Sequence, residues 1–359
     1  MRNTPGLVTS LFAALTICAC AADEASDAAD PSETGSDGQG DVTDPPPSDP
    51  PANCTPSTDV VPLGELADYL ETSAGIVTGD AVRAGDGTIY FISEVEADQS
   101  GATISRREPC KAIELDWMTV SAPIVDLEIS ADNQLYMAGS GWGFADNVVE
   151  RLYRLDLTDP NAFPQNLVRE PGQVISSMSA APDGRLFFID GPVGSERSLR
   201  YVDGDDIVTV SELPFSTTDA MSVAALSDGK IVTSGRVYNP TTLAGSNALV
   251  RFVLSSNGDV TPSSITTQQR FVRMYGDSTG GVYGVAYSGL TSSERDWMIF
   301  HAPYVGAAWT EVARETSKPA MFSVSFGIVG DSTAVMFMPK ATTQPFRSVA
   351  LPAPLMTML

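Results

Sequence analysis

Residues 79–92, GDAVRAGDGTIYFI, decide the fold of this 359-residue chain. Apolar residues flank the pair Asp86-Gly87 on both sides. This pattern predicts two short strands joined by a tight turn, because such turns need a positive φ that Gly and Asn tolerate best. The pattern recurs at 124–139, 175–191, 221–235, 271–288 and 322–339. The turns centre on Asp86, Asp132, Asp183, Asp228, Thr279 and Asp331, with spacings of 46, 51, 45, 51 and 52 residues. A repeat of this length predicts one supersecondary unit stacked six times.

Two further strands follow most of these hairpins. The third strand has an arginine near its start, and the fourth is more polar, as in IVTVSEL (207–213) and WTEVARE (309–315). The arginines are Arg106, Arg154, Arg200, Arg251 and Arg347. Four strands in about 50 residues is the size of a propeller blade. Over residues 58–359 the chain resembles the six-bladed β-propellers of the TolB-like, NHL and gluconolactonase-like kind. The resemblance implies an all-β fold, a six-bladed β-propeller of four-stranded blades.

The last blade lacks an evident fourth strand, and two segments are candidates for it. Residues 59–66 resemble the fourth strand of the third blade, so we expect them to close the ring between the two termini. Residues 355–359 are the alternative. The apolar stretch 319–339 contains Asp331, Gly327 and Gly330. These residues favour two buried strands and a turn over a transmembrane helix.

The N-terminus has the features of an export signal. Arg2 precedes the apolar run 7–17, which is shorter than the roughly 20 residues that a membrane-spanning helix needs. The run leads into Ile17-Cys18-Ala19-Cys20, which resembles the lipobox of the bacterial lipoprotein signal family. The resemblance implies a signal peptide at 1–19 and acyl chains such as palmitate on Cys20. It implies a lipid anchor in the cell envelope, and Ala21 favours the outer membrane of a Gram-negative bacterium. Ordinary secretion is the alternative.

Residues 20–57 form the expected linker. The segment 21–57 is rich in Ala, Asp, Ser, Gly and Pro and contains no Lys or Arg. Such a segment buries too little apolar surface to offset the entropy of ordering, so we expect a disordered acidic tether. The net charge of the whole chain is −24, which disfavours nucleic acid as a partner.

The cysteines outside the lipobox are Cys54 and Cys110. Export places them where disulfides form. Cys54 precedes the proposed closing strand of blade six, and Cys110 lies between the third and fourth strands of the adjacent blade one. A disulfide between them is therefore expected, with two free thiols as the alternative.

The loops between second and third strands, at 93–103, 138–150, 190–198, 234–247 and 286–296, are long. In propellers these loops share one face, and aromatic and arginine side chains on loops suit binding. The predicted ligand-binding residues are Trp142, Phe144, Arg236 and Tyr238.

Four carboxylates are expected to line the channel: Asp80, Asp126, Asp190 and Asp219. Oxygen ligands converging on an axis would suit Ca²⁺, which takes six to eight of them. The metal-binding residues of gluconolactonase-like propellers have no residue-by-residue match here. The lone histidine, His301, cannot build a multi-histidine zinc site, and we expect it to be structural.

Two functions compete on these grounds. The first is a non-enzymatic scaffold, anchored to the membrane, that binds a protein, glycan or small ligand through its loops. The second is a lactonase-like hydrolase with a metal cation in the channel. Convergence of three or more oxygen ligands in the channel would favour the second.

Overall fold

The computed structural model describes residues 81–95, 101–122, 124–139, 152–168, 173–192, 197–213, 222–238, 245–254, 260–267, 269, 271–288, 295–317, 325–330, 333–337 and 346–350. All of them belong to the compact unit that spans residues 47–359. The signal peptide, Cys20 and the linker lie outside the described residues, so these assignments stay predictions.

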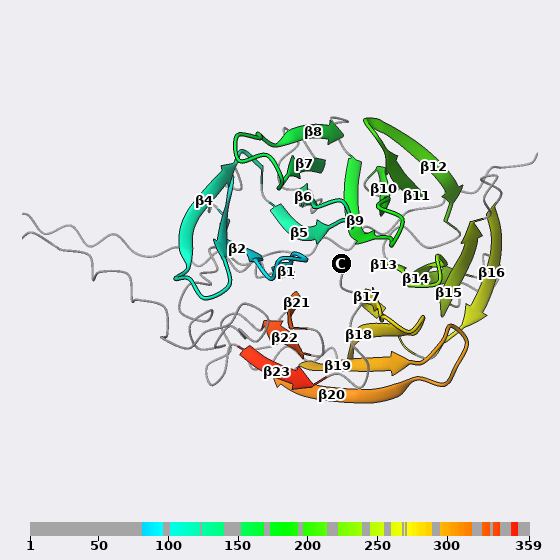
Figure 1. Ribbon diagram of the computed structural model, residues 1–359. Coiled ribbons are helices and arrows are strands. Elements are labelled where there is room, and N and C mark those ends of the chain that lie inside the picture. The colour runs from blue at the N-terminus through cyan, green and yellow to red at the C-terminus, as the bar shows by residue number, and fades with distance from the viewer. Residues whose placement is uncertain are drawn as a thin grey trace, which may run out of the picture. The chain divides into compact units, whose positions relative to one another are not determined.

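The described residues form six antiparallel sheets and contain no helix, which confirms the all-β prediction (Figure 1). Five sheets have four strands and the sixth has three, each strand pairing with the next in chain order. The strands of the first three sheets are β1 (Ala81–Arg83), β2 (Ile89–Val95), β3 (Ala102–Arg107), β4 (Glu114–Val120), β5 (Ile124–Ile129), β6 (Gln134–Gly139), β7 (Leu152–Asp156), β8 (Gln165–Val168), β9 (Gln173–Ala180), β10 (Leu186–Pro192), β11 (Ser198–Asp203) and β12 (Asp206–Glu212). Those of the last three are β13 (Ser222–Ala225), β14 (Ile231–Tyr238), β15 (Gly245–Leu254), β16 (Val260–Thr266), β17 (Phe271–Gly276), β18 (Val282–Ser288), β19 (Arg295–Ala302), β20 (Thr310–Ser317), β21 (Ser325–Gly330), β22 (Thr333–Phe337) and β23 (Phe346–Ala350).

The first strand of each sheet is its innermost strand. Neighbouring innermost strands contact each other in the order β21, β1, β5, β9, β13, β17. Figure 1 shows these strands gathered around a common centre, with the fourth strands on the outside. This arrangement is an all-β propeller. The fourth strand of the sixth sheet stays a prediction, because 59–66 and 355–359 both lie outside the described residues.

The predicted turns owe their geometry to Gly and Asn. In the first sheet Ala84 N donates to Thr88 O at 2.8 Å, and Gly87 has a φ of 90°. In the second sheet Ser130 N donates to Gln134 O at 3.0 Å, and Asn133 has a φ of 60°. The backbone bonds recur at the equivalent residues of the next three sheets, which confirms the register read from the repeat.

The sheets share two ends. We call the turn end the one where the first strand joins the second and the third joins the fourth. We call the loop end the one where the second strand joins the third and one sheet passes to the next. The ends coincide because the innermost strands run in the same direction. Hydrogen bonds between neighbouring innermost strands show this shared direction, because the donor advances along one strand as the acceptor advances along the other. Asp126 and Glu128 of β5 accept bonds from Met178 N and Ala180 N of β9. Ser177 and Ser179 of β9 accept bonds from Val223 N and Ala225 N of β13.

Apolar side chains fill the space between adjacent sheets. Ile104 of the first sheet and Leu135 of the second are fully buried in one cluster, and Phe188 packs with Leu152 between the second and third sheets. Each fully buried side chain of this kind contributes about 1.5–3 kcal/mol. The core is thus divided among the junctions between sheets.

The apolar stretch 319–339 forms strands in its described part. β21 and β22 pair antiparallel, with Ser325 opposite Phe337. Within the described residues no helix is long and apolar enough to cross a membrane.

Candidate functional site

The carboxylates predicted to line the channel lie in two different environments. Asp126 is on the innermost strand β5 and is 5% exposed. Asp190 is on β10, the second strand of its sheet, and its Oδ2 accepts a bond from Arg200 Nη1 at 2.9 Å. The expectation that Asp190 lines the channel is therefore corrected, because Arg200 on the adjacent strand neutralises it within the sheet. Asp80 and Asp219 lie outside the described residues.

The predicted ligand-binding residues are placed only in part. Arg236 and Tyr238 were assigned to a loop, but both lie on β14, paired with Asn247 and Gly245 of β15. The alternation Arg236-Val237-Tyr238 suits a strand, and continued pairing reduces the connection to 239–244. Trp142 and Phe144 lie outside the described residues, so ligand binding by all four residues stays a prediction.

Asp126 is the centre of a polar cluster at the innermost strands. Its Oδ2 accepts a bond from Met178 N of β9 at 3.1 Å and lies 2.7 Å from Arg273 Nη1 of β17. The strands β9 and β13 lie between β5 and β17 in the order of contacts. The Asp126–Arg273 ion pair therefore joins the second sheet to the fifth across the space that the innermost strands surround.

Glu128 lies two residues further along β5 and completes the cluster. Its Oε1 accepts a bond from Ala180 N at 2.9 Å. Burial raises the pKa of Glu128 to about 8, helped by the charge of Asp126, while the bond from Ala180 and the charge of Arg273 oppose the rise. At neutral pH the raised pKa therefore favours the protonated form of Glu128.

This chemistry suits the joining of sheets better than the holding of a cation. The guanidinium of Arg273 lies 2.7 Å from Asp126 Oδ2, and its positive charge would repel a divalent ion there. Within the described residues no group of three or more His, Cys, Asp or Glu is arranged to hold a metal ion. The Ca²⁺ hypothesis stays a prediction that depends on Asp80 and Asp219.

The sequence prediction missed Arg273 and Glu128, although the repeat contained a signal for each of them. Asp126, Ser177, Ser222 and Arg273 are each six residues before the turn centre of their repeat. Arg273 thus stands where the second repeat has its aspartate. Glu128 shares a strand face with Asp126, because side chains two residues apart point to the same side.

A second buried carboxylate serves the fifth turn. Asp277 is fully buried, and its Oδ1 accepts bonds from Thr279 N at 2.8 Å and Gly281 N at 2.7 Å. Its Oδ2 lies 2.7 Å from His301 Nε2, and the imidazole stacks on Tyr283 at 4.4 Å. Burial alone would raise the pKa of Asp277, but the bonds from His301, Gly281 and Thr279 outweigh it and lower the pKa. His301 is thus part of the hydrogen-bond network that holds the fifth turn.

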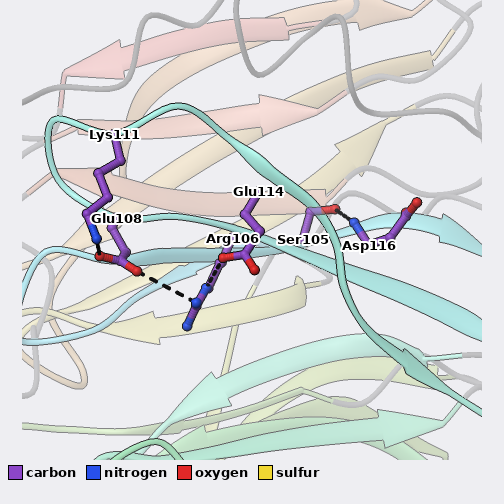
Figure 2. Close-up of polar contacts among 6 residues, drawn as sticks. All are labelled: Ser105, Arg106, Glu108, Lys111, Glu114 and Asp116. Carbon is purple, nitrogen blue, oxygen red and sulfur yellow. Dashed lines mark hydrogen bonds and ion pairs between the residues drawn. The ribbon is translucent and has the colours of Figure 1, made fainter. Parts of the chain in front are cut away.

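The third and fourth strands of the first sheet carry the polar cluster drawn in Figure 2. Arg106 lies between Glu108 and Glu114, with Nε 2.6 Å from Glu114 Oε2, and Lys111 pairs with Glu108. These pairs tie the two strands together beside their turn.

Cys110 lies in this turn with a φ of 61°. It is assigned to a disulfide, and its partner lies outside the described residues. The pairing with Cys54 stays a prediction.

No protein-family model matches the chain, and no curated protein matches it. Solved structures do match. The β-propeller domain of the Trilobed protease from Pyrococcus furiosus is 10% identical with a TM-score of 0.46, covering 80% of this chain and 96% of that one. A fungal lectin with a six-bladed β-propeller fold, Aleuria aurantia lectin, is 11% identical with a TM-score of 0.45, covering 78% and 97%. Puromycin hydrolase, in a mutant form, is 13% identical with a TM-score of 0.41, covering 79% of this chain and 53% of that one. The chain thus spans about half the length of the hydrolase. Sequence identities and TM-scores this low assign neither a family nor a ligand to the chain. The propeller fold is assigned from the arrangement of the chain's own sheets.

Proposed function

We propose that the chain is an envelope lipoprotein, anchored through lipidated Cys20, whose propeller is a non-enzymatic scaffold. The scaffold binds a protein or glycan at its loop end, through Trp142, Phe144, Arg236 and Tyr238. The cysteine pair Cys54–Cys110 joins the tether to the first sheet. The lipobox and the acidic linker support the anchor, and the six repeats support a ring of six blades.

We favour a scaffold over a hydrolase because of the contacts that the carboxylates on β5 make. Asp126 and Glu128 accept hydrogen bonds from β9, and Arg273 of β17 neutralises Asp126. A hydrolase of the lactonase type would need such oxygens turned toward a cation. Here they hold neighbouring sheets together, which leaves the loops as the part that varies between sheets and is suited to recognition.

The anchor is tested by metabolic labelling with a fatty-acid analogue and by membrane flotation. We expect the wild-type protein to be labelled and to float with membranes, and Cys20→Ala to lose both properties. Undiminished labelling of the variant would contradict the assignment of Cys20.

Binding at the loop end is tested on a microarray of neutral, sialylated and bacterial surface glycans. The variant is Trp142→Ala/Phe144→Ala, between β6 and β7. The matched control is Phe163→Ala, an 87% exposed aromatic residue between β7 and β8, at the turn end of the same sheet. We expect the double variant to lose binding and the control to keep it.

The hydrolase is tested in parallel with a panel of lactones in the presence of Ca²⁺. Turnover by the wild-type protein that Asp126→Asn abolishes would overturn the non-enzymatic assignment. Equal loss of glycan binding in the loop variant and the control would remove the loop end as the site.

A further inference from the structure

The junction between the second and third sheets contains charged side chains in its half nearest the loop end. Asp190 lies near the end of β10, and Arg200 is the third residue of β11. Arg200 lies directly opposite Phe188, which packs in one cluster with Leu152 of the second sheet. Residues opposite each other on paired strands share a face of the sheet, so Arg200 faces the second sheet.

The repeat places apolar side chains at the same position in other sheets. The residue opposite the fifth residue after the turn centre is Arg200 in the third sheet, Tyr153 in the second and Phe300 in the fifth. Tyr153 and Phe300 are buried in apolar clusters. A buried ion pair is costly to desolvate and adds little stability over an apolar contact. The departure of the third sheet from the repeat therefore indicates a use for the charge, because such departures are expected at functional sites.

A second arginine lies near the same carboxylate. Arg197 directly precedes β11, is 8% exposed, and donates from Nη1 to Ser176 Oγ of β9 at 3.1 Å. Burial lowers the pKa of Arg197, and the negative charge of Asp190 opposes this effect without cancelling it. A lowered pKa means that the surroundings disfavour the charged form of the guanidinium. An additional negative charge beside Arg197 would therefore be stabilised.

Two guanidiniums thus lie near one buried carboxylate. Asp190 is fully buried and accepts a bond from Arg200 Nη1 at 2.9 Å. The side chain of Arg200 is 21% exposed, so an incoming group reaches it from solvent. Glu212, opposite Ser198, is exposed and forms no ion pair with either arginine, so water screens its charge. In a chain with a net charge of −24, such a place attracts an anionic group that the rest of the surface repels.

We propose that Arg197 and Arg200 bind the carboxylate of an acidic sugar, of the sialic or uronic acid class, in the ligand of the loop end. A guanidinium offers a planar fork of donors that matches a carboxylate, and hydrogen bonds between charged groups are the strong ones. The connection that carries Trp142 and Phe144 begins at the end of β6, in the sheet that Arg200 faces. This inference rests on the proposed glycan-binding function and adds the class of glycan.

A methyl ester tests the carboxylate directly, because it removes the charge and leaves the rest of the sugar unchanged. The full-length protein is applied to a microarray of sialylated and uronic-acid glycans, each printed as the free acid and as the methyl ester, beside sulfated and neutral glycans. We expect the wild-type protein to bind the free acids at least about tenfold more tightly than the esters. This preference should fall as the salt concentration rises.

Two variants test the arginines. Arg197→Gln and Arg200→Gln should each weaken binding of the free acid by about tenfold and leave binding of the ester unchanged, because the ester lacks the group that the arginine holds. Partial unfolding would weaken both ligands alike. Arg185→Gln, at an arginine of the turn end of the same sheet that pairs with Asp183, is the matched control and should keep the preference. Arg200→Lys keeps a charge beside Asp190 and replaces Arg200→Gln if that variant does not fold. It should also weaken the acid, because an ammonium lacks the fork.

The outcomes separate this inference from the proposed function. If glycans bind and Trp142→Ala/Phe144→Ala abolishes that binding, but acid and ester bind equally, the acidic sugar is wrong and the glycan scaffold stands. If both arginine variants keep the wild-type preference for the acid, the carboxylate is bound elsewhere and the assignment of Arg197 and Arg200 is wrong. Tighter binding of sulfated than of carboxylated glycans would overturn the carboxylate as the recognised group. If no glycan binds, the glycan-binding function fails and this inference fails with it.

Discussion

Replacing Glu128 with glutamine should change how stability depends on pH. Burial raises the pKa of Glu128 from its ordinary value of 4.5 to about 8. Between these two values the folded protein holds a proton that the unfolded chain has released. The stability that Glu128 contributes is thus fully present below pH 4.5 and is lost as the pH rises through 8.

The magnitude follows from the same two values. A difference of 3.5 between about 8 and 4.5, at 1.36 kcal/mol for each unit, gives an upper limit of ~5 kcal/mol. Glu128 is only half-buried, so water screens part of this cost and we expect about 2–4 kcal/mol. Glutamine keeps an oxygen that accepts the bond from Ala180 N but cannot ionise.

Urea unfolding of the wild-type protein and Glu128→Gln at pH 5, 7 and 9 measures the effect. We expect similar stabilities at pH 5 and a more stable variant at pH 9, by about 2–4 kcal/mol. Glu212→Gln, at an exposed glutamate of β12, is the matched control and should follow the wild type throughout. Parallel pH profiles for Glu128→Gln and the wild type would refute the argument that Glu128 is held protonated.

Three further substitutions, examined by urea unfolding, test the cross-ring pair, the junction of the fourth and fifth sheets, and the fifth turn. Arg273→Ala leaves Asp126 buried without its counter-charge, and should cost about 2–4 kcal/mol. Gly276→Ala places a Cβ 2.2 Å from Ala225 O, a backbone atom that cannot move aside alone, and should cost about 1–3 kcal/mol. Asp277→Asn removes charge-assisted bonds and should cost about 1–3 kcal/mol at pH 7. This last cost should vanish in acid, because the stability from Asp277 is present above its ordinary pKa of 3.8 and is lost as the pH falls through its lowered value.

Each substitution has a control nearby. Arg314→Ala breaks ion pairs with Glu311 and Asp296 on the exposed face of the fifth sheet, and should cost much less than Arg273→Ala. Ser278→Ala, at an exposed residue of the fifth turn, should be neutral. Asp203→Asn, at an exposed carboxylate of β11, is the control for the change of charge and should leave stability at pH 7 unchanged. A cost for Arg314→Ala equal to that for Arg273→Ala would mean that the cross-ring pair is energetically ordinary.

The sheets could be predicted from the sequence because each repeat contains residues that are typical of a tight turn. Asp86-Gly87 and Asp132-Asn133 stand where positive φ is needed, and counting from them also locates strands that lack a clear pattern. The arginines chosen by the same count, such as Arg154 and Arg200, lie on the third strands of their sheets. Strand ends were less predictable. Arg236 was predicted to lie in the loop 234–247, but it lies on β14 because pairing between β14 and β15 continues as far as Tyr238.

The partners of the channel residues could not be predicted in the same way. Asp126 and Arg273 are far apart in the sequence, and their contact depends on which sheets lie opposite each other in the ring. The count of repeats gives the position of each residue within its sheet. It gives no distance between residues on opposite sides of the ring. It also does not predict that Asp190 is buried and paired with Arg200 of the adjacent strand.

One position in the repeat shows how similar sheets form junctions with different contacts. The residue six before the turn centre faces the next innermost strand, so an acceptor there can bind the strand's N–H, as Asp126 and Ser177 do. In the fourth sheet this position is Ser222, whose Oγ has no hydrogen-bond partner among the described residues. At this junction Ser234 Oγ of β14 donates instead to Phe271 O of β17 at 3.1 Å, and β17 comes close to Ala225 at Gly276. Arg273, at the same position of the fifth sheet, pairs with Asp126. The side chain at this position therefore differs with the strand that it meets: Asp126 and Ser177 accept bonds from the next innermost strand, and Arg273 reaches a strand across the ring.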